Sequence, residues 1–358
     1  VKMGGGNDTV IASANNADHA YFGEDGNDLF IYNAANVGAG TTNNMSFIGG
    51  SGTDTVKLTS NAGTALSLAA GTTKAFFESV EALSINGTAA AGTITLAADQ
   101  LSGDKTTVSG TSSSNEDNLI IASDSNDHTI DLSTLTINST LDSLTIDLST
   151  TNLRDDKAIT VTTTAAKETI TVDVEANKGL TLNAGAGNDT IDIEQATLTE
   201  TMTITLGAGK DTVDFDLAAN GTSSISTASD RFIITDFSLA DDTLHFSSGG
   251  AVAADTVASV DVTSDTSEAD SDIQASINDG LITLDGDDKA NVNSLSEWVN
   301  VAEAVIGTNL AVAGFVYDGN TYVVENLAAG TVANVVQLTG VTTTVIGTGA
   351  GVVSVDFT

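Results

Sequence analysis

Aspartate recurs in this chain directly after short glycine-rich segments, and an apolar residue follows two positions later. Residues 49–57, Gly-Gly-Ser-Gly-Thr-Asp-Thr-Val-Lys, fit the nine-residue pattern G-G-x-G-x-D-x-U-x at every position, where U is a large apolar residue. Residues 3–10, 23–30, 184–191 and 206–213 are partial copies that depart from it at one or two glycines. Copies that share one phase indicate a repeated structural unit.

Glycine and aspartate in this order suit a turn that binds a metal ion. Glycine adopts the positive φ angles of a tight corner, and its missing side chain leaves carbonyl oxygens free to face a cation. Calcium takes six to eight oxygen ligands, more than one turn offers, so we expect each ion to lie between two successive stacked turns. A lone copy of the pattern also fits a turn without metal, whereas repeated copies in phase predict several bound calcium ions.

The expected ligands form two groups. Asp8, Asp28 and Asp54 are expected to act together, and so are Asp189 and Asp211. The apolar residues that follow the turns are expected in the core, namely Val10, Phe30, Val56, Ile191 and Val213. The full set of expected metal ligands is Gly4, Gly6, Asp8, Gly23, Asp25, Gly26, Asp28, Gly49, Gly50, Gly52, Asp54, Gly185, Gly187, Asp189, Gly207, Gly209 and Asp211.

The separations of the aspartates along the chain give the length of one coil. Asp8 and Asp28 are 20 residues apart, Asp28 and Asp54 are 26 apart, and Asp189 and Asp211 are 22 apart. Two nine-residue units make one coil of a parallel β-roll, so turns on one edge recur every ~18 residues or slightly more. We therefore expect the turns to stack along one edge only, with irregular loops such as residues 33–44 on the other.

Composition favours an all-β fold that recruits cations. The 358 residues include 48 acidic and 11 basic ones, a formal charge of −37. Repulsion of this size opposes compaction unless cations are bound, and 41% hydrophobic residues are more than a disordered acidic segment normally contains. Cysteine is absent, which leaves oxygen ligands for a metal. Proline is also absent, which suits long uninterrupted sheets whose turns are made by the 34 glycines.

The same sequence excludes several classes of function. There is no basic stripe to bind nucleic acid or an anionic membrane surface. No segment approaches the ~20 apolar residues that span a bilayer, so we expect no membrane insertion, and the N-terminus lacks the features of a secretory signal. His19, His128 and His245 are isolated, and the motifs H-E-x-x-H and G-x-S-x-G do not occur. We therefore expect a chain that is not an enzyme.

Strand-like segments continue between the two groups of aspartates. Residues 129–133 and 145–149 alternate apolar residues with Thr, Ser or Asp, as strands with one buried face do, and residues 159–162 and 169–174 are similar. Residues 123–130 have the form of a degenerate turn, for which metal binding is left open. This part of the chain is expected to continue the solenoid with few metal sites.

The remainder of the chain is expected to form a β-rich cap. Aromatic residues gather at residues 230–246, where they suit the end of a solenoid, and residues 247–280 are expected to be loop-rich. Residues 295–306 predict a helix whose capping box is Ser294 and Glu297. Residues 315–324 predict a hairpin with Asp-Gly or Gly-Asn at its turn.

The predicted fold is therefore all-β, a parallel β-roll or β-helix solenoid with calcium-binding Gly/Asp turns and a C-terminal β-rich cap that carries one short helix. Four regions are expected: a first calcium-binding block at residues 1–60, a degenerate solenoid at 61–181, a second block with the cap at 182–246, and a β-rich C-terminal region at 247–358.

The repeats resemble those of the RTX family, bacterial proteins that are exported through a one-step type I channel and fold outside the cell on calcium. The resemblance covers residues 3–58 and 182–246. It implies that the aspartates and the glycine carbonyls of the turns are calcium ligands. The family's export signal is C-terminal and uncleaved, and Asp356 and Phe357 near the end of this chain look like such a signal. Recognition by type I secretion machinery is thus implied.

The wider layout is similar to that of RTX-type bacterial surface-layer (S-layer) proteins, in which calcium turns alternate with strands such as residues 77–85. Those proteins tile the cell surface as a two-dimensional lattice. This resemblance implies a structural protein that is secreted and assembles laterally with copies of itself. Because the chain begins inside a repeat, we expect it to be the C-terminal part of a longer protein.

Three alternatives stay open. The chain could be the calcium-dependent tail of an exported enzyme, part of a large adhesin, or an ice-binding surface that begins with the threonine pairs at residues 160–162 and 169–171. The acidic pairs at 155–156, 241–242 and 287–288 are expected to be solvated loop tips and not acid/base dyads, because nothing nearby predicts their burial. Trp298 is expected to belong to the core.

Overall fold

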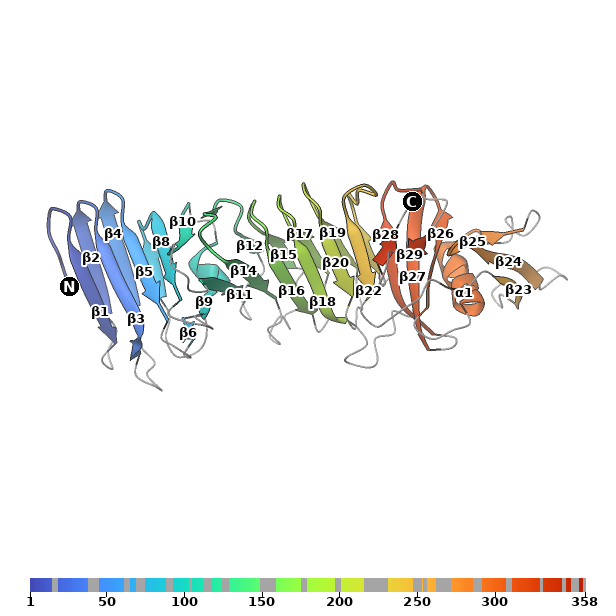
Figure 1. The fold of residues 1–358 in the computed structure, drawn as a ribbon, viewed down its shortest axis with the longest axis horizontal. Coiled ribbons are helices and arrows are strands. Elements are labelled where there is room, and N and C mark those ends of the chain that lie inside the picture. The colour runs from blue at the N-terminus through green and yellow to red at the C-terminus, as the bar shows by residue number, and fades with distance from the viewer. Residues whose placement is uncertain are drawn as a thin grey trace. The chain divides into compact units, whose positions relative to one another are not determined.

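The computed structural model describes residues 1–14, 19–37, 45–60, 65–68, 75–87, 93–102, 105–111, 117–123, 129–148, 159–174, 179–196, 201–215, 231–246, 253, 256–261, 272–285, 292–306, 311–328, 331–342, 346–348 and 354–356. The chain divides into two compact units, and Figure 1 shows their strands and helix coloured by position along the chain. Unit 1 consists of Val1–Asp155 and Val161–Thr171, and unit 2 of Asp156–Thr160 and Val172–Thr358.

Unit 1 is built from parallel sheets of short strands. One six-stranded sheet has the order β1-β3-β5-β8-β10-β13, and a three-stranded sheet has the order β2-β4-β7. A third group of parallel strands in unit 1 has the order β6-β9-β11-β14. The strands are β1 (Thr9–Ala14), β2 (His19–Asp25), β3 (Leu29–Val37), β4 (Met45–Ser51), β5 (Thr55–Thr59), β6 (Leu66–Ser67), β7 (Ala75–Glu78), β8 (Ala82–Asn86), β9 (Thr93–Ala97), β10 (Thr107–Gly110), β11 (Asn118–Ala122), β12 (Thr129–Asp131), β13 (Thr136–Ile137) and β14 (Ser143–Asp147).

Alternation of side chains along these strands builds the core of unit 1. In β3, Phe30 and Tyr32 are fully buried while the residue between them is partly exposed, as the period of two in a strand requires. Phe47 stacks against Tyr21 on one neighbouring strand and Phe77 on the other, with ring centroids 5.7 and 6.1 Å apart. Identical register in successive coils thus gives a column of aromatic rings inside the sheets.

Unit 2 continues with parallel strands and ends in a mixed sheet. The parallel part has the orders β17-β19-β21 and β18-β20-β22. Its strands are β17 (Leu180–Asn183), β18 (Thr190–Ala196), β19 (Met202–Thr205), β20 (Thr212–Phe215), β21 (Phe232–Ile234) and β22 (Thr243–Phe246). The later elements are β23 (Thr256–Asp261), β24 (Asp272–Asn278), β25 (Leu281–Leu284), α1 (Leu295–Val305), β26 (Ala311–Tyr317), β27 (Asn320–Ala328), β28 (Thr331–Leu338), β29 (Gly347–Thr348) and β30 (Ser354–Asp356).

Strand pairing changes direction after β22. β28 pairs in parallel with β21, while β26, β27 and β28 pair antiparallel with one another. β30 pairs antiparallel with β22. Phe232 and Phe246 pack against Phe215 with ring centroids 5.0 and 5.1 Å apart, so the aromatic residues of this region lie inside the last parallel strands.

The helix and the hairpin are confirmed where the sequence predicts them. The Ser294 side chain accepts from the Glu297 N–H, and the Glu297 carboxylate accepts from the Ser294 N–H at 2.8 Å, so the capping box forms. Trp298 is buried and stacks on Phe315 at 5.1 Å. Asp318 has a φ of 47° between β26 and β27, as a tight two-residue hairpin turn requires.

Strand predictions for the middle of the chain are also confirmed. Strands occur at 129–131 and 143–147, and β15 (Ile159–Thr162) and β16 (Thr169–Val174) lie at the remaining predicted positions. The degenerate turn at 123–130 falls mostly outside the described residues, because residues 124–128 are not among them. The same applies to the acidic pairs at 155–156 and 287–288, to His128 and to Phe357.

Three local predictions are wrong. Residues 33–37, expected to be loop, continue strand β3, because this strand pairs with both β1 and β5. Residues 256–261 and 272–278, expected in a loop-rich segment, are the antiparallel strands β23 and β24. The threonine pairs at residues 160–162 and 169–171 cannot form one row of threonines on a single sheet. β15 lies beside β12 in one sheet, whereas β16 lies beside β14 in another.

Glu168 is a buried carboxyl group in unit 1, 1% exposed. Its Oε1 accepts from the Thr164 N–H at 3.0 Å and from the Thr164 hydroxyl. Burial raises the pKa of Glu168, although these hydrogen bonds act in the opposite direction. Folding therefore favours the protonated form of Glu168. This group stabilises the fold at pH values below the pKa that it has in the unfolded chain. The contribution is lost as the pH rises through the higher pKa that it has in the folded chain.

We expect Glu168→Gln to remove this part of the pH dependence, because glutamine is neutral at every pH. Thermal unfolding followed by circular dichroism from pH 4 to 8, at one fixed calcium concentration for variant and parent, measures it. The variant should lose less stability than the parent chain as pH rises. Asp131→Asn is the control, because a hydrogen bond from the Ser133 hydroxyl lowers the pKa of Asp131, so its contribution changes mainly at lower pH and this variant should keep the parent's slope. Parallel pH profiles for Glu168→Gln and the parent would contradict the prediction.

Candidate metal centres in the stacked turns

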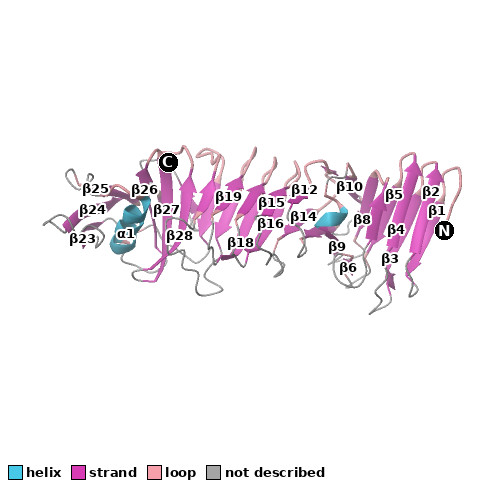
Figure 2. Cartoon of the chain, turned by 180° about the vertical axis from the view of Figure 1, so that it is seen from behind, coloured by secondary structure: helices cyan, strands magenta, loops and turns pink. Residues whose placement is uncertain are grey.

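The turns before β1, β3 and β5 stack on one another in unit 1. Asp8, Asp28 and Asp54 each precede a strand by one residue, and those strands pair in register, Thr9 with Leu29 and Leu29 with Thr55. Figure 2 shows these turns as pink loops at the same ends of neighbouring strands. The prediction that the turns stack along one edge is therefore confirmed.

Each turn has two positive φ angles, at the residues four and two positions before the aspartate. In the turn that ends at Asp54 these are Gly50 at 112° and Gly52 at 138°. In the turn that ends at Asp28, Glu24 takes the first of these positions with a φ of 76°, and not Gly23. The other pairs are Gly4 and Gly6, Gly185 and Gly187, and Gly207 and Gly209.

Gly23 and Gly49 serve the site by leaving space. A Cβ at Gly23 would overlap the Asp28 Oδ2 atom, and one at Gly49 would overlap the Asp54 Oδ2 atom. The bare Cα therefore lets the carboxylate lie against the backbone of its own turn. Asp25 is placed differently: it is exposed, and its carboxylate accepts from the Ser51 hydroxyl at 2.6 Å.

A ladder of hydrogen bonds connects the aspartates of successive coils. The Asp8 N–H donates to Asp28 Oδ1 at 2.8 Å, and the Asp28 N–H donates to Asp54 Oδ1 at 2.8 Å. The Asp54 N–H continues the ladder by donating to Glu81 Oε2 at 2.7 Å. Each carboxylate thus projects toward the preceding coil and lies in the gap between two turns.

A second ladder runs in the opposite direction and was not predicted. Asn7 Oδ1 accepts from the Asn27 N–H at 2.8 Å, and Asn27 Oδ1 accepts from the Thr53 N–H at 2.9 Å. Asn188 Oδ1 likewise accepts from the Lys210 N–H at 2.9 Å in unit 2. The recurrence of Gly-Asn-Asp in three of the turns is the sequence signal that could have shown it.

The second carboxylate oxygen of the ladder residues lacks a hydrogen-bond donor. Oδ2 of Asp28, Asp54 and Asp211 is buried and accepts no hydrogen bond, and these residues are 2%, 0% and 1% exposed. A buried acceptor without a donor loses its hydration without replacement. Each of these oxygens therefore requires a proton or a cation that the neighbouring protein groups do not supply.

Carbonyl oxygens of one turn face the glycines of the next. A Cβ at Gly26 would overlap Gly6 O, and a Cβ at Gly52 would overlap Gly26 O. In unit 2 a Cβ at Gly209 would overlap Gly187 O in the same way. The gap between two turns is therefore lined by carbonyl oxygens and closed to any side chain at these positions.

The stack in unit 2 repeats this arrangement. The Asp189 N–H donates to Asp211 Oδ1 at 2.8 Å, and β18 and β20, the strands that follow, pair in register. Asp189 and Asp211 are both buried. The core residues expected after the turns are confirmed as fully buried at Phe30, Val56, Ile191 and Val213, while Val10, in the first coil, is only half-buried.

Burial and neighbouring charges disfavour the ionised form of the central aspartates. Desolvation raises the pKa of Asp54, and the carboxylates of Asp28 and Glu81 act in the same direction against the Asp28 hydrogen bond. Desolvation also raises the pKa of Asp211, with Asp242 and Asp236 adding to it. An ion that neutralises these carboxylates would remove this penalty.

The donor set of the gaps fits calcium better than a transition metal. The oxygens shown to face the gaps belong to carboxylates and backbone carbonyls, the ligands that hard cations prefer. Within the part of the chain that the structure describes, no group of three or more His, Cys, Asp or Glu side chains converges on one point. Backbone carbonyls would therefore have to supply most of the ligands, as the glycine-rich turns allow.

Asp117 is a buried aspartate that the sequence analysis missed. Its Oδ1 accepts from the Gly87 N–H and its Oδ2 from the Thr111 N–H, both at 2.6 Å. Its own N–H donates to Asp142 Oδ2 at 2.7 Å. Asp117 thus occupies a ladder position without a glycine turn, and protein donors saturate both of its oxygens.

Two predictions about acidic residues and histidines need correction. Asp242 is not a solvated loop tip, because it is half-buried and its Oδ1 accepts from the Asp211 N–H at 3.0 Å. His245 is not isolated, because its Nδ1 lies 2.9 Å from Asp214 Oδ1 on the neighbouring strand. In both cases the pairing of the neighbouring strands β20 and β22 brings groups that are far apart in the sequence together.

Comparisons of the chain with protein-family models, with curated proteins and with solved structures give no match. No helix among the described residues is long and apolar enough to cross a membrane. The functional argument therefore depends on the sequence repeats and on the geometry of the turns.

We expect Gly26→Ala to destabilise the fold more than Gly6→Ala. Both glycines have positive φ, 128° and 115°, so alanine adds backbone strain of about 1–3 kcal/mol at either position. Only at Gly26 would the added Cβ also overlap a carbonyl of the preceding coil, since no atom lies within 4 Å of a Cβ at Gly6. Thermal unfolding of both variants in calcium measures the difference, and equal losses of stability would contradict the close packing of the turns.

Proposed function

We propose that this chain is a structural protein of the bacterial cell surface that folds on calcium outside the cell. The observation that carries the proposal is the buried Oδ2 of Asp28, Asp54 and Asp211, each without a hydrogen-bond donor in a gap lined by carbonyl oxygens. Three gaps have this composition: between the turns of Asp8 and Asp28, of Asp28 and Asp54, and of Asp189 and Asp211.

The residues that would hold the ions are the aspartates and the carbonyls of the preceding turn. Asp28 would act with Gly6, and Asp54 with Glu24 and Gly26. In unit 2, Asp211 would act with the carbonyls of Gly185 and Gly187. When bound, calcium supplies positive charge to oxygens that have been removed from water; no reaction step is involved.

The charge of the chain makes folding depend on the calcium concentration. A formal charge of −37 opposes compaction, and extracellular calcium modules bind at about 10⁻⁴ to 10⁻³ M. Calcium at ten times its dissociation constant stabilises a fold by about 1.4 kcal/mol per independent site. Several sites together would favour the folded state in a calcium-rich exterior and not at the low calcium concentration of a cytosol.

Lateral assembly into a surface layer is the second part of the proposal. It is supported by the similarity of the repeats and strands to RTX-type surface-layer proteins, and export by type I machinery is proposed on the same basis. The partner is a second copy of the chain. A soluble calcium-dependent module of an adhesin or of an exported enzyme would share the folding mechanism without the lattice.

We expect Asp54→Asn to weaken the dependence of stability on calcium concentration. Asparagine keeps an oxygen for the Asp28 N–H but loses the charge and the second carboxylate oxygen. The rise in unfolding free energy on adding millimolar calcium should fall by about 1–2 kcal/mol.

Asp117→Asn is the matched control for Asp54→Asn, because Asp117 is equally buried but has donors on both oxygens. It should lose about 1–3 kcal/mol at every calcium concentration at which the chain folds, with an unchanged dependence on calcium. If Asp54→Asn behaved like Asp117→Asn, the ladder would be a hydrogen-bonding device without a metal.

We expect regular sheets when chelator-treated protein is given millimolar calcium, because folding would then create the surfaces that assemble. Negative-stain electron microscopy before and after the addition tests folding and assembly on one sample. Compact separate particles that form only with calcium would support the soluble module and contradict the lattice. Identical images in both conditions would contradict the calcium argument.

A further inference from the structure

The turn that follows Asp211 differs from the glycine turns before it. Residues 235–242 join β21 to β22 and have no glycine, but they hold three aspartates, Asp236, Asp241 and Asp242. β20 and β22 pair in register, Thr212 with Thr243, so this turn stacks directly on the turn of residues 207–211. The gap between these two turns is called the terminal gap below.

Protein donors meet the carboxylate oxygens of the terminal gap. Asp236 Oδ1 accepts from the Leu206 N–H and Asp236 Oδ2 from the Gly207 N–H, both at 2.8 Å. Asp242 Oδ1 accepts from the Asp211 N–H at 3.0 Å and Asp242 Oδ2 from the Ser238 N–H at 2.8 Å. Both carboxylates therefore bridge backbone donors, and the last glycine turn donates to each of them.

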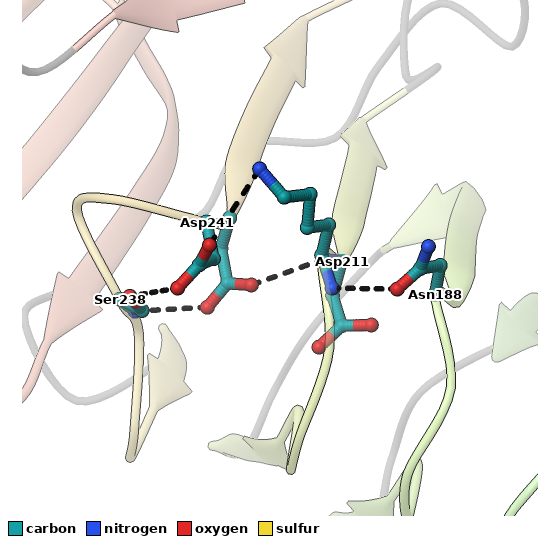
Figure 3. A network of polar contacts seen from close by, with 6 residues as sticks. Asn188, Asp211, Ser238 and Asp241 are labelled. Carbon is teal, nitrogen blue, oxygen red and sulfur yellow. Dashed lines mark hydrogen bonds and ion pairs between the residues drawn. The ribbon is translucent and has the colours of Figure 1, made fainter.

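Asp241 contacts the side chains of a lysine and a serine. Its Oδ1 lies 3.6 Å from Lys210 Nζ, and its Oδ2 accepts from the Ser238 hydroxyl at 3.3 Å. Lys210 occupies the position that asparagine has in the turns of Asn7, Asn27 and Asn188. Figure 3 shows these polar contacts connecting Asn188, Asp211, Ser238 and Asp241.

The neighbouring gap, between the turns of Asp189 and Asp211, is different in composition. The carboxylate of Asp211 projects into it, with Oδ1 bonded to the Asp189 N–H and Oδ2 buried without a donor. The carbonyls of Gly185 and Gly187 face the same gap. The first gap thus holds a buried carboxylate oxygen without a donor, Asp211 Oδ2, whereas the carboxylate oxygens of Asp236 and Asp242 in the next gap all have donors.

We propose that the terminal gap excludes calcium and that Asp236 and Asp242 form a metal-free end to the turn stack of unit 2. Backbone N–H groups satisfy both carboxylates there, in place of the positive charge that calcium supplies in the neighbouring gap. This inference rests on the proposed calcium function for the number of ions, but the hydrogen-bonded cap itself does not depend on it.

Hydrogen exchange of two matched amides tests the inference in the parent chain. The Asp189 and Asp211 N–H groups both donate to the Oδ1 of the next aspartate, one across each gap. Across the range of calcium concentrations in which the chain is folded, the Asp211 amide should keep the same protection, whereas the Asp189 amide should gain protection as calcium rises. Calcium-dependent protection at both amides would overturn the proposal.

Counting bound calcium by native mass spectrometry provides the second test. Asp211→Asn should lose one ion, while Asp236→Asn and Asp242→Asn should keep the parent number. The latter two should instead show about tenfold faster amide exchange in residues 201–215 at every calcium concentration at which the chain is folded, as expected for a lost hydrogen bond to a charged group. Asp241→Asn, which removes the same charge from a more exposed contact, is the control and should change neither quantity.

Loss of an ion in Asp236→Asn or Asp242→Asn would show that the terminal gap binds calcium and would overturn the proposal. A parent chain that binds no calcium would contradict the proposed function, yet the exchange of Asp242→Asn in chelator would still test the cap. If Asp242→Asn does not fold, Asp236→Asn and the two amides of the parent chain test the same point.

Discussion

The rest of the turn structure depends on one constraint, which is that aspartates of the same charge are stacked one strand spacing apart. Parallel strands in register place equivalent residues of successive coils about 4.8 Å apart. Asp28 and Asp54 therefore lie side by side, as their hydrogen bond shows. Each carboxylate is buried among like charges, so it requires hydrogen-bond donors, protons or cations to be tolerated.

The fold meets this requirement only in part with its own groups. In every gap of the two stacks the backbone N–H of one coil meets one oxygen of the next carboxylate, as at Asp28 and Asp211. The second oxygen is where the gaps differ. At Asp28 it has no donor, while at Asp242 it has the Ser238 N–H. Glycine is present in both turns of the first arrangement, whereas in the second it is missing from residues 235–242, the turn that supplies the carboxylates.

The sequence shows the repeated parts of this arrangement and not the parts that depend on how coils of different length align. Asp54 and Val56 could be placed in a turn and in the core, because the nine-residue pattern fixes their relation locally. The pairing of Asp117 with Asp142, or of Asp211 with Asp242, joins residues 25 and 31 positions apart with no shared motif. The lengths of the loops between the strands set that register, and the residue types around each aspartate do not predict it.

Asp117 explains why the middle of unit 1 can continue the sheets without glycine turns. Its coil keeps a buried carboxylate at the ladder position but places the Gly87 and Thr111 N–H groups on its two oxygens. A carboxylate with donors on both oxygens needs no cation, so its turn has no need of converging carbonyls or of positive φ. The glycine pattern is therefore lost in this part of unit 1 because hydrogen bonds, and not a cation, stabilise the buried carboxylate of Asp117. The parallel register of β9, β11 and β14 persists through it unchanged.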